Sequence, residues 1–156
     1  MTKYVPQFKL RNREHDIVCE EMEAFLRSIN SPLLGLSYFI KDCADYFKIN
    51  EIFILALCAH ESNWGKSAIA KVKNNLCGWG AIDADPMGGA WNFFSREGCI
   101  MTVCGFLNRN YLTRGAKYYK GGTVRTVGSI YASDPKWADK ICKIMNQIGD
   151  WIHEHK

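Results

Sequence analysis

The stretch EIFILALCAHESNWG, from Glu51 to Gly65, is apolar on nearly every side and predicts a helix that lies in the core. Residues 52–58 carry no charge, so this helix has no face that suits water. Asn50 precedes it as a helix N-cap, and Gly65 is expected to end it as a C-terminal cap. We therefore expect the rest of the fold to pack around this helix.

A carboxylate, Glu61, stands near the C-terminal end of this helix. The partial negative charge of the helix end repels a carboxylate, and apolar neighbours remove the water that would solvate it. Both effects favour the protonated carboxyl, which is the state that a general acid needs near neutral pH. The other interpretation is that Glu61 points to water or pairs with a lysine such as Lys66.

Tryptophans surround a glycine-rich segment that follows the helix. Trp64, Trp79 and Trp91 stand in or beside residues 74–95, where glycines and Pro86 predict an irregular surface segment or a short β-hairpin. Exposed aromatic faces suit the apolar faces of sugar rings. For each tryptophan, the alternative is packing in the core.

Helical spacing of apolar residues makes the rest of the chain mainly α as well. The length of 156 residues, 47% of them hydrophobic, predicts one domain with a packed core. Residues 1–13 are expected to form a loose N-terminal arm. Ser37 is a candidate N-cap, and so are Ser133 and Asp134, with Pro135 in the first turn of the last helix. The expected helices cover 14–29, 36–49, 51–62, 67–73, 96–112, 123–132 and 133–155.

Composition and motifs argue against several classes of function. A net charge of +4 is mild and the lysines look scattered along the chain, which argues against nucleic-acid binding, although it suits an anionic polymer. No segment reaches the roughly 18 apolar residues of a membrane span. The position four after His60 is Trp64, so the zinc motif H-E-x-x-H is absent, and we expect neither a metal nor a cofactor.

The cysteines are seven, an odd number, so at least one must stay unpaired within a single chain. Cys58 lies inside the apolar stretch, and Cys99 and Cys104 flank another. These positions are typical of small core residues in a protein made in a reducing compartment. We therefore expect reduced core thiols rather than a disulfide framework.

Several blocks carry a resemblance to a known family. They read AHESNWGKSAIAK, NNLCGWGAIDADP, SREGCIMTVCGFLNRNYL and SIYASDPKWADKICKIM, in this order. They resemble the bacterial and phage endo-β-N-acetylglucosaminidases of glycoside hydrolase family 73, whose pattern joins ES.WG.S, NN..G..A.D..P and YA.DP.WA.KI. The resemblance implies a lysozyme-like α-helical fold with a substrate groove. It also implies cleavage of the β-1,4 bond after N-acetylglucosamine in peptidoglycan glycan chains.

The resemblance also implies roles for particular residues. Glu61 falls on the catalytic acid of the family and Tyr131 on the tyrosine of its YA.DP motif. No clear match exists for the second glutamate that family members often carry, and Asp83 stands in the loop where a helper would sit. Otherwise the substrate's own acetamido group or a distant base would complete the reaction. Core packing is the alternative role for Tyr131. The expected substrate-binding residues are Trp64, Asn75, Trp79 and Trp91.

Two rival functions are compatible with these residues. One is an N-acetylmuramidase or lytic transglycosylase, which shares the fold and a single glutamate but cuts the other glycosidic bond. The other is a non-catalytic wall-binding module, which would not need an acid at position 61.

Expectations about partners and cellular location complete the prediction. The partner is the peptidoglycan glycan strand, with no nucleic acid and no membrane, and the chain is expected to be a monomer, with room for a wall-binding domain after Lys156. The segment before residue 17 lacks the apolar region of a signal peptide. This favours a phage lysin made in the cytoplasm over a fragment of a secreted autolysin.

Overall fold

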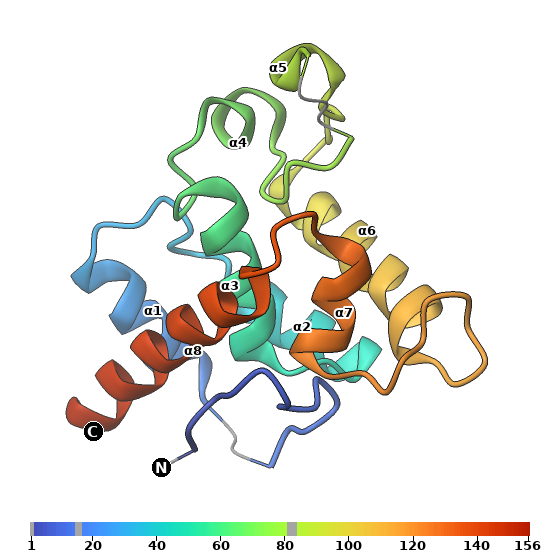
Figure 1. The fold of residues 1–156 in the computed structure, drawn as a ribbon. Coiled ribbons are helices and arrows are strands. Elements are labelled where there is room, and N and C mark those ends of the chain that lie inside the picture. Colours follow the sequence, from blue (N-terminus) through green and yellow to red (C-terminus); the bar gives the residue numbers. More distant parts are fainter. Residues whose placement is uncertain (1, 15–16, 81–83) are drawn as a thin grey trace.

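The computed structural model describes residues 2–14, 17–80 and 84–156, and these are mainly helical, as predicted. Figure 1 shows α3 near the centre, with α8 and α2 packed against it. The helices are α1 (Cys19–Ser28), α2 (Ser37–Phe47), α3 (Glu51–Ser62), α4 (Ala68–Lys73), α5 (Pro86–Gly89), α6 (Arg96–Leu107), the π-helical turn η1 (Asn108–Leu112), α7 (Val124–Tyr131) and α8 (Trp137–Glu154).

Helix α3 is buried along almost its whole length, which confirms the prediction from its composition. No residue from Ile52 to Ala59 exposes more than 2% of its surface. The Asn50 side chain accepts a hydrogen bond of 3.0 Å from the N–H of Phe53, so the predicted N-cap is confirmed. Burial of this apolar helix by its neighbours is the main stabilising contribution that its sequence offers.

The C-terminal end of α3 differs from the prediction that Gly65 caps it. Asn63 takes the left-handed conformation at the C-cap, with φ of 49°. The Ser62 hydroxyl then accepts a hydrogen bond of 2.8 Å from the N–H of Gly65. A Cβ on Gly65 would lie 3.0 Å from the Leu33 side chain, so glycine is needed there for close packing as well as for its φ of +86°. Asparagine tolerates the left-handed region better than most residues, so the cap lies two positions before Gly65, while the helix covers 51–62 as predicted.

The N-terminal segment is packed on the body of the molecule, so the prediction of a loose arm is wrong for residues 2–13. Tyr4 and Leu10 are buried. The Arg11 guanidinium donates to the carbonyl oxygens of Phe47 (2.7 Å) and Leu112 (3.1 Å), and so joins the segment to α2 and η1. Two buried side chains and backbone pairing were enough to fix a segment that lacks helical periodicity.

Of segment 74–95, the described residues 74–80 and 84–95 are irregular apart from the short helix α5, so the choice between an irregular segment and a hairpin stays a prediction. Asn75 holds its first half together. Its side-chain oxygen accepts from the N–H of Trp79 (2.9 Å), and its side-chain nitrogen donates to the carbonyls of Trp79 (2.9 Å) and Trp91 (3.1 Å). The Asn75 amide therefore links the backbone at Trp79 to the backbone at Trp91.

Two helix starts were predicted incorrectly. The cap position of α2 is Leu36. Ser37 is the first residue of the helix, and its buried hydroxyl has no hydrogen-bond partner among the described residues. Helix α8 begins at Trp137 rather than at Ser133 or Asp134, which leaves Pro135 before the helix. The Asp134 carboxylate instead accepts from the N–H of Lys136 (2.9 Å).

All seven cysteines are free, and every one except Cys19 is buried, as expected for core thiols. Among the described helices, none combines the length and apolar character that crossing a bilayer would require.

Candidate active site

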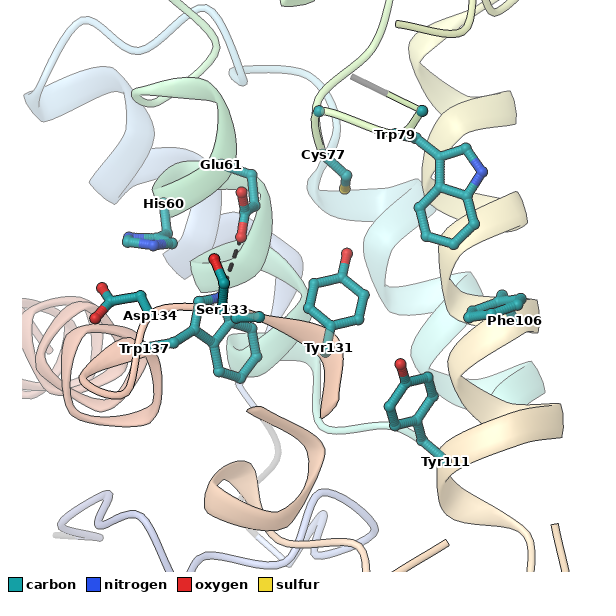
Figure 2. Close-up of a pocket in the computed structure, with 13 residues that line it drawn as sticks. His60, Glu61, Cys77, Trp79, Phe106, Tyr111, Tyr131, Ser133, Asp134 and Trp137 are labelled. Carbon is teal, nitrogen blue, oxygen red and sulfur yellow. Dashed lines mark hydrogen bonds between the residues drawn. The ribbon is translucent and has the colours of Figure 1, made fainter. Parts of the chain in front are cut away.

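A cleft of about 560 Å³ opens beside the C-terminal end of α3. Figure 2 shows that side chains from four parts of the chain surround this cleft. Helix α3 supplies His60 and Glu61, the loop after α4 supplies residues 77–80, and Phe106 and Tyr111 come from α6 and η1. The remaining wall runs from Tyr131, at the end of α7, to Trp137 at the start of α8.

Glu61 projects from α3 into this cleft and is only partly buried. Its Oε1 atom accepts a hydrogen bond of 3.1 Å from the indole Nε1–H of Trp137. Trp137 itself is 2% exposed and packs against Tyr131 and Phe53 at ring-centroid distances of 5.5 and 6.4 Å. A buried indole thus fixes one oxygen of an otherwise accessible carboxyl group.

The close approach of α7 to α8 depends on Gly128. A Cβ atom at this position would lie 2.6 Å from Cε3 of Trp137, closer than real Cβ contacts. Glycine therefore lets the Trp137 ring lie flush on α7, where its N–H reaches Glu61.

Tyr131 presents its phenol oxygen to the cleft, between Glu61 and Trp79 (Figure 2). The hydroxyl has no hydrogen-bond partner among the described residues, while the ring packs against Trp137 and Tyr111. Burial, followed by the nearby Cys77 and Glu61, raises the pKa of the Tyr131 phenol well above its usual value. The phenol is therefore protonated at neutral pH and can donate a hydrogen bond to a bound molecule.

Aromatic rings form the wall opposite Glu61. Trp79 lies edge-on to Phe106 at 5.0 Å, and Phe106 continues to Tyr111 at 6.0 Å. Tyr111 belongs to η1, and π-helical turns often occur at functional sites because they reorient a side chain. These rings and the polar atoms of Glu61 and Tyr131 face the same space, which is the combination that binds sugar rings.

Asp134 is the other carboxylate that lines the cleft among the described residues. Its hydrogen bond with Lys140 (2.6 Å), followed by that from the Lys136 N–H, lowers the pKa of the Asp134 carboxyl. It is therefore a charged group that anchors the turn before α8 rather than a proton donor, although it does not cap the helix as predicted.

The structure separates the other predicted site residues. Trp64 lies outside the cleft lining and packs on Phe25 at 5.6 Å. Asn75 is 1% exposed and organises its own loop. Trp91 is 55% exposed and packs on Trp79 at 6.4 Å, but it is not among the residues that line the cleft. Asp83 lies outside the described residues, so its predicted role stays a prediction.

Several cleft residues were missed by the reasoning from sequence. Trp137 lies within the predicted last helix, but nothing in the sequence analysis predicted its N–H contact with Glu61. Its position within the YASDPKWA block, six residues after Tyr131, was the available signal. Phe106 and Tyr111 carried no such signal, because the π-helical turn that orients Tyr111 has no recognisable sequence pattern.

Comparisons with known proteins agree with this geometry. The sequence model of the glucosaminidase family, described as mannosyl-glycoprotein endo-beta-N-acetylglucosaminidase, matches residues 38–150. A Streptococcus pneumoniae protein described as "Putative endo-beta-N-acetylglucosaminidase" is 36% identical over 128 residues, which are 80% of this chain and 19% of that protein. The chain thus spans about a fifth of the length of this curated relative.

Solved structures share the fold. A catalytic mutant of S. aureus autolysin E, in complex with the disaccharide NAG-NAM, matches with a TM-score of 0.76 and 19% identity over 98% of this chain and 75% of that chain. The catalytic domain of the Listeria monocytogenes autolysin Auto matches with a TM-score of 0.60 and 18% identity over 91% of each chain. Because the family's sequence model covers well over half of the residues, the chain belongs to the glucosaminidase family, glycoside hydrolase family 73.

Proposed function

We propose that this chain hydrolyses peptidoglycan as an endo-β-N-acetylglucosaminidase, cutting the β-1,4 bond after N-acetylglucosamine. The observation that carries the proposal is the placement of Glu61, the accessible carboxyl group of a cleft with an aromatic wall, at the position of the acid in the family motif. The disaccharide bound by the structurally similar S. aureus autolysin E is the type of substrate that such a cleft suits.

Glu61 is the proposed general acid. Trp137 occupies Oε1 through its N–H, so the proton to be transferred is expected on Oε2. From there it passes to the glycosidic oxygen as the bond to the anomeric carbon breaks, and the sugar acquires oxocarbenium character. A fixed Oε1 also restricts rotation of the carboxyl group, which keeps the acid oriented before the substrate binds.

The second catalytic group is proposed to be the substrate's own 2-acetamido oxygen, which can attack the anomeric carbon in substrate-assisted glycosidases. The protonated Tyr131 hydroxyl, which faces the same space without a protein partner, would orient that acetamido group. Asp83 as a base is the alternative, and the two differ in what Asp83→Asn does. Substrate assistance predicts a small loss of activity, whereas a base role predicts a loss as large as that of Glu61→Gln.

The experiment that tests the proposed bond is analysis of digested, borohydride-reduced peptidoglycan by mass spectrometry. New chain ends should carry reduced N-acetylglucosamine, and Glu61→Gln protein provides the blank. Reduced N-acetylmuramic acid would identify a muramidase instead, and an anhydro product would identify a lytic transglycosylase.

A further inference from the structure

The basic residues of this chain are distributed unevenly. Residues 1–13 and 98–133 together contain nine of the 20 lysines and arginines and none of the 16 aspartates and glutamates. The rest of the chain holds 11 basic and 16 acidic residues, so the net positive charge comes from these two segments.

The two acid-free segments lie side by side in the fold. An antiparallel bridge pairs Lys9 with Thr123. The N–H of Leu10 donates to the Gly122 carbonyl over 2.9 Å, and Figure 1 shows the N-terminal segment passing next to the start of α7. Lys9 and Arg11 of the first segment therefore line the same groove as Arg114 of the second, although the sequence shows them far apart.

A groove of about 430 Å³ lies where the two segments meet, and it shares no lining residue with the catalytic cleft. Lys9, Arg11 and Arg114 supply its charge, and Tyr119 supplies its aromatic ring. The Arg11 guanidinium is held in place by neutral acceptors, including the Asn108 side-chain oxygen at 2.8 Å, and no carboxylate of the described residues pairs with it.

The remaining cations of this groove and its rim are available to an anion. Lys9, Arg114 and Lys120 are exposed, and none has a carboxylate at ion-pair distance in the described part of the chain. Other basic residues of the two segments do have such partners: Lys3 lies 3.7 Å from Asp150, and Arg125 lies 3.8 Å from Asp139.

Residues 113–122, which form one side of this groove, also pack against the wall of the catalytic cleft. The Lys117 ammonium lies 5.2 Å from the ring centroid of Tyr118, and Tyr118 packs at 5.1 Å on Tyr111, which lines that cleft. If a glycan strand lies in the cleft, a polymer attached to the cell wall nearby would therefore be close to the basic groove.

We propose that this groove binds a phosphodiester polymer of the cell wall, an inference that rests on the proposed function. Arginine and lysine are the side chains that bind phosphate oxygens, and arginine can do so with two parallel hydrogen bonds. Proteins that bind single-stranded nucleic acid stack successive bases on several aromatic rings. The described lining of this groove offers only Tyr119, which favours a polymer without bases.

Poly(glycerol phosphate) of fixed length is the probe, and its affinity is measured by calorimetry over a range of salt concentrations. The triple variant Lys9→Gln, Arg114→Gln, Lys120→Gln should bind it much more weakly. In nucleic acids each phosphate contact contributes about 0.7–0.9 to the slope of log affinity against log salt concentration. Because poly(glycerol phosphate) carries its charges farther apart, the slope should fall by up to about two in this variant.

The matched control is Lys66→Gln, Lys71→Gln, Lys143→Gln, which removes the same charge from exposed residues outside the groove. It should bind like the wild type, and circular dichroism and melting curves confirm that both variants fold. On walls stripped of phosphodiester polymers, the triple variant and the wild type should bind equally.

Three results would overturn the proposal: no binding by the wild type at low salt, an equal loss of binding in the control, or tighter binding of single-stranded DNA than of poly(glycerol phosphate). Calorimetry with the soluble polymer does not depend on hydrolysis. A failure of the proposed glycosidase activity would appear only in the products of wall digestion, so the two failures can be told apart.

Discussion

The indole N–H of Trp137 and the carboxyl of Glu61 meet from helices that are far apart in the sequence, over 3.1 Å. Because Trp137 is only 2% exposed, its N–H can position the Glu61 carboxyl while its ring offers the substrate little surface. Its contribution is expected in the orientation of the carboxyl group, and hence in kcat more than in KM.

Replacement of Trp137 by phenylalanine tests this role at the residue scale. A hydrogen bond between neutral groups contributes about 0.5–1.5 kcal/mol, so kcat should fall by about two- to tenfold with little change in KM. Trp151→Phe, in the same helix but packed on Phe25 and His155, is the control and should leave kcat unchanged.

Nuclear magnetic resonance of ¹⁵N-labelled indoles separates positioning from packing. The Trp137 Nε1–H signal should change its position in Glu61→Gln, because the acceptor of its hydrogen bond changes, while the Trp151 signal should not. An unchanged Trp137 signal in Glu61→Gln, or unchanged kcat in Trp137→Phe, would show that the tryptophan serves only in packing.

Tyr131→Phe removes a hydroxyl that points into the cleft and keeps the ring that packs beneath it. Because that hydroxyl has no partner in the described protein, the midpoint of thermal unfolding should hold, while the rate of wall hydrolysis falls. The raised pKa keeps the phenol protonated, so Tyr131 should add no limb to the pH profile below about pH 10. Tyr46→Phe, at a side chain that is 79% exposed, is the control. A stability loss near 1 kcal/mol with activity retained would indicate a packing role instead.

At the scale of elements, the cleft depends on how closely α7 approaches α8. Gly128→Ala would place a Cβ 2.6 Å from Trp137 Cε3 and push the indole away from Glu61. Overpacking costs about 1–3 kcal/mol, so both the unfolding midpoint and kcat should fall. Gly149→Ala, in α8, meets only an ordinary contact of 3.5 Å with Tyr4 and should raise the midpoint, because alanine favours helices. If Gly128→Ala keeps full stability and activity, the close approach is not needed.

The helices themselves were largely predictable, and their ends were less so. The uncharged apolar run and the Asn50 cap identified α3 because these signals are local. The start of α8 was misplaced because the Asp134 side chain accepts from Lys136 and pairs with Lys140 rather than capping a longer helix. Such a choice between two local hydrogen-bonding patterns is decided by tertiary contacts that the sequence does not display.

At the scale of the whole molecule, the sequence predicted the candidate functional groups of the cleft better than the other residues that form its walls. Glu61, Tyr131 and Trp79 were predicted and are brought together. Trp64 and Asn75 instead support the structure, because an exposed and a buried tryptophan or asparagine look alike in a motif. The basic groove was also hidden, since its two segments are separated by more than 80 residues and meet only in the fold.

The most direct measurement is clearance of purified walls by Glu61→Gln protein. Glutamine keeps the shape of the side chain and can still accept from Trp137, but it cannot supply an acid proton. General acid catalysis contributes about 10²- to 10⁴-fold to the rate. The rate of clearance should therefore fall by a factor in that range, while the unfolding midpoint stays the same or rises. Glu154→Gln, at an exposed residue at the end of α8, should clear walls like the wild type. Near-normal clearance by correctly folded Glu61→Gln protein would contradict the assignment of Glu61 as the catalytic acid.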